Sequence, residues 1–313
     1  MDPIDVYFVL LPGVLLTDFA GPAEALRIAN GFGGRFALQH VGPEPRPRTS
    51  LGLALDGVAP LPAQLPAGAW LVIPGLSSTV EGLGQAAIRA TIDWLRQVWR
   101  PDVKLLTICS AALVAASAGL LDDRRCTTHH TLTERLRALA PRARVEDDRV
   151  FVIDGGVATS AGVTTGIDLA LELIAAEAGP RTALEVARDM VVWLRRDGDA
   201  PQLSPFLAHR NHLHPAIHRV QDAISADPSR GWPLAEMARI ACVSPRHLAR
   251  LFREHAGIAP LDYRQQLQLA HVEPLLADAG RSLERIAEAG GFGSARDLRR
   301  VWQRQRGTAL RRG

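Results

Sequence analysis

The sequence contains few cysteines and no long apolar run. Its three cysteines, Cys109, Cys126 and Cys242, are far apart in 313 residues, which excludes a disulfide framework and fits a reducing cytoplasm. Apolar neighbours predict that Cys126 and Cys242 lie in a core. The N-terminal segment lacks the basic region and cleavage site of a signal peptide, so we expect it to form a strand. No apolar run approaches the length of a membrane span, so we expect no membrane partner.

Lysine is absent from residues 209–313, where arginine supplies the positive charge. This segment holds 17 arginines and 10 acidic residues, for a net charge of +7. Residues 1–208 hold 19 basic and 23 acidic residues, for a net charge of −4. The asymmetry predicts one end that binds a polyanion and one end that does not. Arginine suits bidentate contacts to phosphate or guanine.

The first two-thirds of the chain alternate strand-like and helix-like segments. The length allows two or three domains, and an apolar content of 47% excludes general disorder. Near-continuous apolar runs are typical of buried parallel strands, and this alternation predicts a three-layer α/β domain. We expect strands at 4–11, 36–41, 69–73 and 103–108, helices at 18–29, 86–99, 111–119, 166–178 and 181–192, and a hairpin within 150–161.

A segment rich in proline, aspartate, glycine and histidine interrupts this pattern. It predicts a linker over 196–216, between a domain at 1–195 and a helical domain at 217–313. The linker region contains four histidines without cysteine partners, and their spacing matches no standard zinc pattern. We therefore expect solvated linker residues rather than a metal site at His209, His212, His214 and His218.

The helical domain contains one short pattern twice. SPRHLARLF at 244–252 recurs fifty positions later as SARDLRRVW at 294–302, and each copy follows a short helix-like run, at 234–241 and 283–290. Ser244 and Ser294 suit the N-cap of a helix. Each unit therefore predicts a helix, a tight turn and a second helix.

The second helix of each unit has an apolar stripe and a basic face. Leu248, Leu251 and Phe252 have the spacing of a buried stripe, which Leu298, Val301 and Trp302 repeat. The opposite face predicts contacts with a DNA major groove, and a bland alternative is a pair of amphipathic helices with solvated charges. The residues on this face are Arg246, His247, Arg250, Arg253, Arg296, Arg299 and Arg300.

Cys109 and Ser110 lie between a predicted strand and a helix of small residues. Such a sharp turn lifts a side chain into the crevice above the sheet, and helix amides lower the pKa of a thiol there. The alternative is a small buried core cysteine. Asp18, Glu24 and His129 are candidate partners for the thiol, although the sequence does not show whether they touch it.

Residues 217–310 resemble the DNA-binding domain of the AraC/XylS transcription factors. The match lies in SPRHLARLFREHAGIAPLDY (244–263) and IAEAGGFGSARDLRRVWQRQRG (286–307). The resemblance implies two helix-turn-helix units joined by a long helix, with base contacts at Arg246, Ala249, Arg250, Ala295, Arg296, Arg299 and Arg300. Gln268 stands where the family usually has arginine, and Pro274 predicts a kink in the joining helix. Leu298, Trp302 and Leu310 also depart from the family, so we expect the second unit to bind weakly or mainly to hold the fold.

Residues 4–195 resemble the flavodoxin-like, class-I glutamine-amidotransferase-like fold, in its PfpI and isocyanide-hydratase branch. The match lies in DFAGPAEALRIAN (18–30), LVIPG (71–75), ICSAALVAASAGLLDDRRCTTHH (108–130) and TSAGVTTGIDLAL (159–171). It implies that Cys109 takes the elbow position and that Asp18 faces it. The chain has Cys-Ser-Ala where the family has Cys-Thr-Gly, and His130 where the family has tryptophan. These changes touch the pocket, so we predict a ligand pocket with no catalytic residue, cofactor or metal.

Together the two halves resemble GlxA-type regulators. The resemblance implies a cytoplasmic, nucleoid-associated homodimer that binds double-stranded DNA and senses a small metabolite, often a nitrogen compound, in its first domain. RNA polymerase is a further expected partner. Two alternatives stay open. One is a cysteine-dependent hydratase or amidohydrolase with Cys109 as nucleophile and Asp18 as acid/base. The other is an oxidation sensor with an accessible Cys109 thiolate.

Overall fold

The first part of the chain is built around one seven-stranded sheet. The computed structural model describes residues 2–77, 83–192, 196–276, 278 and 280–310, apart from the side chain of Leu207. The strand order is β3-β2-β1-β4-β5-β9-β8, and all neighbours are parallel except the antiparallel pair β8 and β9. The strands are β1 (Ile4–Val9), β2 (Phe36–Gly42), β3 (Ala59–Pro60), β4 (Trp70–Ile73), β5 (Lys104–Ile108), β8 (Phe151–Asp154) and β9 (Val157–Ser160).

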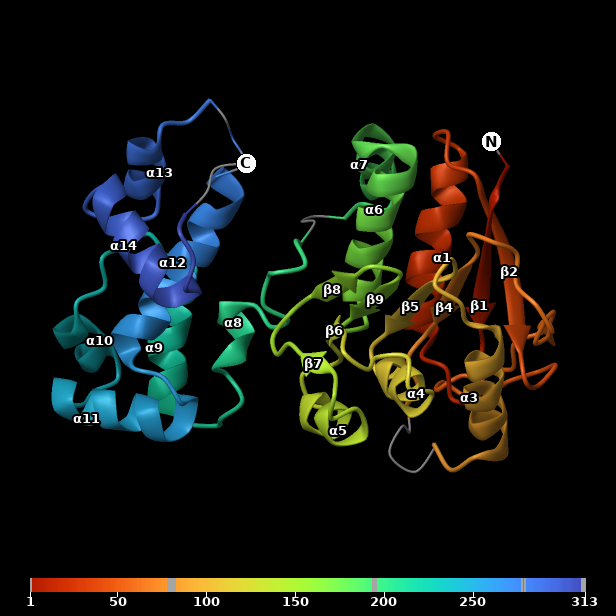
Figure 1. Cartoon of the computed structure of the whole chain (residues 1–313). Coiled ribbons are helices and arrows are strands. Elements are labelled where there is room, and N and C mark those ends of the chain that lie inside the picture. Colours follow the sequence, from red (N-terminus) through yellow and green to blue (C-terminus); the bar gives the residue numbers. More distant parts are fainter. Residues whose placement is uncertain (1, 78–82, 193–195, 277, 279, 311–313) are drawn as a thin grey trace. The chain divides into compact units, whose positions relative to one another are not determined.

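Helices cover the two faces of this sheet (Figure 1). On one face α1 (Leu16–Asn30) packs against α6 (Thr165–Ala178) and α7 (Pro180–Asp189). On the other face α4 (Ala111–Ser117) packs against α3 (Ala86–Val98) and α5 (Thr133–Leu139). A small second sheet pairs β6 (Arg125–Cys126) with β7 (Arg144–Val145). The predicted three-layer α/β fold is confirmed.

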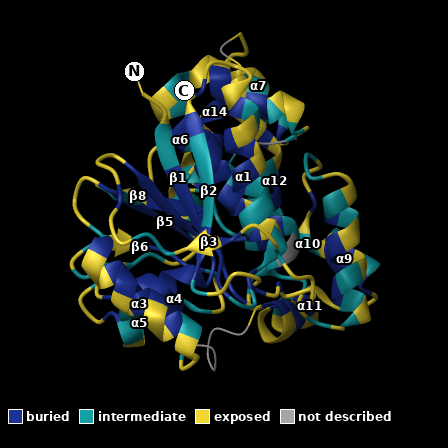
Figure 2. Ribbon diagram, turned by 90° about the vertical axis from the view of Figure 1, so that its right-hand side faces the viewer, coloured by how far each residue is buried: buried dark blue, intermediate teal, exposed yellow. Residues whose placement is uncertain are grey.

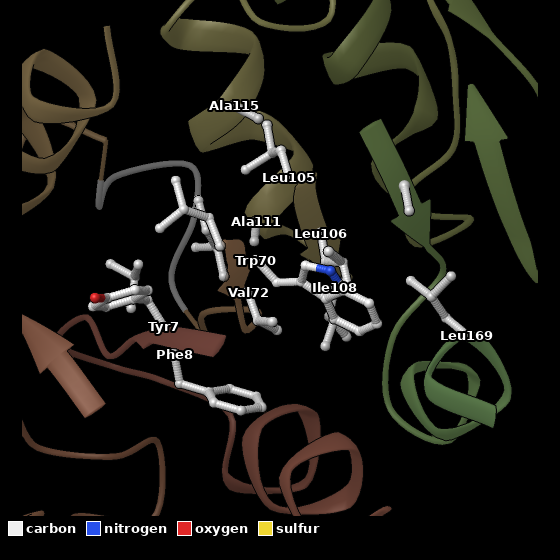
Figure 3. Packing of buried hydrophobic residues seen from close by; sticks show 14 of the residues in the cluster. Tyr7, Phe8, Trp70, Val72, Leu105, Leu106, Ile108, Ala111, Ala115 and Leu169 are labelled. Carbon is white, nitrogen blue, oxygen red and sulfur yellow. The ribbon is translucent and has the colours of Figure 1, made fainter. Parts of the chain in front are cut away.

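The central strands are buried because helices cover the sheet on both sides. Figure 2 shows the central strands as buried, most of β2 as intermediate, and β3 and the outward helix surfaces as exposed. Figure 3 shows Phe8, Trp70, Leu105, Ile108 and Ala111 filling the space beside the sheet. Each of them is at most 1% exposed. Full burial of a large apolar side chain contributes about 1.5–3 kcal/mol, so these runs specify which segments become strands.

The chain divides into two compact units, residues 1–202 and 203–313. The segment predicted as a linker is bonded rather than solvated. Arg196 pairs with Asp168 at 2.6 Å, and the imidazole of His209 lies within hydrogen-bond distance of Ala256 O and Gln266 Oε1. A short helix, α8 (Pro205–Ala208), also lies in this segment. The expectation of solvated histidines was therefore wrong, because these rings pack within the second unit.

The second unit is entirely helical in its described residues and has two apolar clusters. Its helices are α9 (Pro215–Ala226), α10 (Leu234–Ile240), α11 (Pro245–Leu251), the π-helical turn η1 (Phe252–Ala256), α12 (Pro260–Leu276), α13 (Leu283–Ala289) and α14 (Ala295–Arg306). The long helix α12 contributes Tyr263 and Leu267 to one cluster and Leu269 and Val272 to the other. Helix α12 therefore joins two small cores, each built around one helix pair.

Two expectations concern single helices. The helix α12 continues through Pro274, whose ring is exposed, and ends two residues later, so the proline falls in its last turn. A kink there stays a prediction. Over the residues that the structure describes, no helix has both the length and the apolar character needed to cross a bilayer.

Candidate nucleic-acid interface and candidate ligand site

The first helix-turn-helix is formed by α10 and α11, which pack against each other. Between them Cys242 adopts a left-handed backbone conformation, with φ of 57°. Its N–H donates to Arg239 O at 3.1 Å, and the Val243 N–H donates to Ala238 O at 3.0 Å. These two bonds close the end of α10. The Ser244 hydroxyl then accepts from the His247 N–H at 3.3 Å, which confirms Ser244 as the N-cap of α11.

The second helix-turn-helix, α13 and α14, repeats this closure with a glycine. Gly291 has φ of 69°, its N–H donates to Glu288 O at 3.0 Å, and the Phe292 N–H donates to Ala287 O at 2.9 Å. The Ser294 hydroxyl accepts from the Asp297 N–H at 3.1 Å, which confirms the second N-cap. The sequence repeat is therefore a structural repeat.

The apolar stripe of each second helix is buried as predicted. Leu248, Phe252 and Leu298 have no exposed surface, and Trp302 is half-buried. Ala295 is also buried, at 4% exposure. A base contact by Ala295, which the family resemblance implied, is therefore wrong, because this methyl group faces the core of the second cluster.

The opposite face of these helices is basic and exposed. Around α11, a surface hollow is lined by Ser244, Arg246, His247, Ala249, Arg250, Arg253 and Glu254. Arg250 pairs with Glu254 at 3.3 Å, and Arg300 pairs with Asp297 at 2.5 Å, yet both arginines stay about two-thirds exposed. Such exposed pairs contribute little, so a phosphate can displace them. Arg246, Arg253, Arg296 and Arg299 are exposed and form no ion pair with another described residue.

Gln268 holds the second turn in place, a role that the sequence did not reveal. It is 2% exposed, and its Nε2 donates to Gly290 O at 3.1 Å and to Gly291 O at 3.3 Å. A Cβ on Gly291 would lie 1.6 Å from Ser229 O, so this turn also abuts the loop before α10. One amide from α12 thereby fixes the entry to α14.

Cys109 occupies the predicted elbow between β5 and α4. Its φ is 58°, and its N–H donates to Ser160 O at 2.9 Å. Two glycines make room for it. A Cβ on Gly162 would lie 2.1 Å from the Cys109 Cβ, and a Cβ on Gly75 would lie 2.4 Å from Asp18 Oδ2. These close approaches place Cys109 and Asp18 side by side at the carboxyl ends of the strands.

The Cys109–Asp18 pair is buried, and burial raises the pKa of both groups. Asp18 has no exposed surface, and its Oδ1 accepts from the Val163 N–H at 2.8 Å. Oδ2 faces Gly75 and Cys109 without a hydrogen bond of good geometry. Burial raises the pKa of Asp18, against the opposing effect of the Val163 and Gly75 amides and the thiol. Burial, together with the negative charge of Asp18, raises the pKa of Cys109 to about 12. The predicted lowering of this pKa was wrong, because desolvation outweighs the amides of a short helix.

The other predicted pocket residues have different positions. The Ser110 hydroxyl accepts from the Leu76 N–H at 2.7 Å and donates to Leu76 O at 3.0 Å, so it fixes the backbone of the loop after β4. His129 is half-buried and its Nδ1 lies 2.8 Å from Thr131 Oγ1. The structure does not bring Glu24 to this site, because Glu24 is exposed on α1 and pairs with Arg27 at 2.6 Å.

The structure also shows where the other two cysteines lie. Cys126 is buried as predicted, whereas Cys242 is exposed. The core prediction for Cys242 was wrong because the residue lies at the left-handed position of a turn. Among the residues described, no group of three or more histidine, cysteine, aspartate or glutamate side chains is arranged to hold a metal ion.

Comparison with known proteins matches each unit to a family. Residues 5–176 match the DJ-1/PfpI family, and residues 237–312 match a helix-turn-helix domain. The chain is 32% identical to the HTH-type transcriptional regulator GlxA of Rhizobium meliloti, over 95% of this chain and 91% of that protein. It is 30% identical to the HTH-type transcriptional regulator CdhR of Pseudomonas aeruginosa, over 93% of this chain and 85% of that protein.

Two further matches are to a solved structure and to an enzyme. A crystal structure of a ThiJ/PfpI family protein from Pseudomonas syringae shares the fold, with a TM-score of 0.53 and 21% identity over 77% of this chain and 90% of that chain. An isonitrile hydratase from Pseudomonas putida is 28% identical over 58% of this chain and 75% of that protein.

An α/β unit with a cysteine elbow, followed by two helix-turn-helix motifs, defines a two-part regulator architecture. The chain belongs to the DJ-1/PfpI-containing family of HTH-type transcriptional regulators that includes GlxA and CdhR.

Proposed function

We propose that the protein is a sequence-specific DNA-binding regulator that reads DNA with α11 and α14. The observation that carries this proposal is the duplicated, capped helix with exposed arginines on one face. Phosphate contacts by these arginines would position the helices, and Arg246, Arg250, Arg296 and Arg299 would approach base edges. The relatives that match nearly the whole chain are named as transcriptional regulators, which supports the same conclusion.

We further propose that a small metabolite binds beside Cys109 and Asp18. Asp18 Oδ2 lies without a hydrogen-bond partner of good geometry, and a donor on a ligand would satisfy it. A nitrogen compound supplies such a donor. Because Cys109 is 6% exposed, ligand entry requires the loops around the pair to move. Ligand binding would then shift the protein between DNA-binding and non-binding states, in a homodimer that acts in the cytoplasm, on the nucleoid and alongside RNA polymerase.

Two observations favour ligand binding over catalysis at this pair. The raised pKa leaves Cys109 as a thiol at neutral pH, whereas a nucleophile must be a thiolate. In addition, the imidazole of His129 bonds Thr131, and no hydrogen bond joins it to the thiol in the described structure. The hydratase alternative is supported by the isonitrile hydratase match and by the facing carboxylate Asp18. Its test is cysteine-dependent turnover of a simple isocyanide.

The test uses a fluorescent duplex recovered by selecting a random 40-base-pair library on the native protein. Arg246→Ala and Arg299→Ala should each weaken binding of this duplex by about 1–3 kcal/mol, roughly 5- to 150-fold. The matched control is Arg89→Ala, since Arg89 is exposed on α3 of the first unit and forms no ion pair with the described residues. Equal affinities for all four proteins would end the proposal that α11 and α14 bind DNA.

A further inference from the structure

The segment that leads out of the first unit is anchored by a buried carboxylate. We define the exit segment as residues 196–202, directly before the second unit begins at residue 203. The backbone N–H of Arg196 donates to Asp168 Oδ1 at 2.9 Å, and its guanidinium donates to Asp168 Oδ2 at 2.6 Å. The same guanidinium donates to Thr164 Oγ1 at 2.8 Å. Asp168 is 3% exposed, so these charge-assisted bonds lie where water cannot readily replace them.

Thr164 belongs to the loop that holds Asp18. In this loop, residues 162–165, the Thr165 hydroxyl accepts from the Gly162 N–H at 2.6 Å and donates to Gly162 O at 3.0 Å. The Val163 N–H donates to Asp18 Oδ1 at 2.8 Å, and Gly162 lies against the Cys109 side chain. A shift of Cys109 or Asp18 therefore displaces a compact loop that also bonds Arg196 through Thr164.

The far end of the exit segment is tied to Cys109 by a second route. The side-chain amide of Gln202 donates to Thr128 O at 2.9 Å. The Thr128 hydroxyl, fully buried, donates to Cys109 O at 2.8 Å. Each end of the exit segment is thus linked to the Cys109–Asp18 pair. Arg196 is linked to it through the loop 162–165, and Gln202 is linked to it through Thr128.

We propose that the exit segment is a two-point latch whose closure depends on the state of the Cys109–Asp18 pair. A ligand that moves the loop of Val163 or the carbonyl of Cys109 weakens the Arg196 and Gln202 contacts. Release of these contacts loosens the tether of the arginine-bearing unit, which Val150 and Asp148 still bond through its backbone, and changes the DNA binding of that unit. This inference rests on the proposed function, because it supplies the path by which a ligand in the first unit acts on the second.

Bonds from Arg196 to both oxygens of the buried Asp168 favour the closed latch, because hydrogen bonds to a buried charged group are costly to lose. Such a paired element is biased by the pocket and, in return, biases the pocket, because coupling between two sites is reciprocal. Loosening the latch by mutation should therefore loosen the Cys109–Asp18 pair.

The reciprocal effect can be measured by alkylating the full-length native protein with iodoacetamide and following each cysteine by mass spectrometry. Thr164→Val removes only the hydroxyl that bonds Arg196, and Gln202→Ala removes the other contact. The matched control is Arg149→Ala, because Arg149 holds the same segment through Asp199 O at 2.8 Å, outside both routes. Cys242 is exposed and serves as the internal reference, and the buried Cys126 reports general loosening.

Thr164→Val and Gln202→Ala should each raise the ratio of Cys109 to Cys242 alkylation about threefold to tenfold, as expected for one lost hydrogen bond. Arg149→Ala should leave the ratio unchanged. An unchanged ratio in both latch variants, an equal rise in the control, or a parallel rise at Cys126 would each overturn the latch. No DNA is present in this experiment. A failed latch therefore leaves DNA binding untouched, and a failure to bind DNA leaves the alkylation result standing.

The forward effect provides a second test. Asp18→Ala removes the acceptor of the Val163 N–H, and amide hydrogen exchange should then quicken at Arg196 and Gln202. Exchange in β2 serves as the control, because this strand lies on the far side of β1 from β4 and β5. Unchanged exchange across the exit segment would contradict the proposal.

Discussion

Replacing Cys242 with glycine should stabilise the second unit, for a reason that lies in the backbone. A non-glycine residue in the left-handed region costs about 1–2 kcal/mol. Glycine in turn loses about 0.5–1 kcal/mol more backbone entropy on folding. Cys242 is exposed at φ of 57°, so its removal leaves no cavity. The net gain should be about 0.5–1 kcal/mol, or roughly 2–8 °C in Tm for a unit of about 100 residues.

Calorimetric unfolding of the full chain measures this effect, and two variants separate the backbone from the thiol. Cys242→Ala removes the sulfur but keeps a Cβ, so its stability should stay within about 0.5 kcal/mol of the native protein. Gly291→Ala reverses the change in the second turn, where a Cβ would meet Ser229 O at 1.6 Å, and it should destabilise. A Cys242→Gly protein no more stable than Cys242→Ala would refute the strain argument.

The remaining predictions concern Gln268 and Cys109. Gln268→Ala leaves the carbonyls of Gly290 and Gly291 without this donor and should lower the free energy of unfolding by about 1–3 kcal/mol in urea titrations. Gln303→Ala removes an exposed amide bond to Gly307 and should cost under about 0.5 kcal/mol. Because the pKa of Cys109 is about 12, its alkylation should rise about tenfold per pH unit between pH 8 and 11. A plateau below pH 9 would contradict the raised pKa.

Much of the fold could be predicted because the chain has strong periodic signals. Apolar runs such as the one that forms β5 are typical of buried strands between helix layers, and the strands were found within a few residues of their predicted positions. The N-caps Ser244 and Ser294 were equally readable, because a hydroxyl before a helix has a local role. The strands and the helix N-caps could therefore be predicted from apolar burial and from hydrogen bonds between residues close in sequence.

What the sequence could not reveal depends on contacts between distant segments. Gln268 donates to a turn carbonyl 22 residues away, and Arg196 donates to the carboxylate of Asp168, 28 residues away. The pKa of Cys109 was predicted in the wrong direction because a helix N-terminus is visible in the sequence, whereas the burial beside Asp18 is not. Glu24 was misplaced because a helix presents residues six apart on different faces.

The central claim is that the arginine faces of α11 and α14 bind duplex DNA. The most direct measurement is the affinity of the native protein for its selected duplex at salt concentrations from 50 to 400 mM. If five or more phosphates are contacted, the logarithm of the affinity should fall against the logarithm of salt with a slope of about −4.5 or steeper. A flat dependence, or no binding at 50 mM salt, would contradict the account.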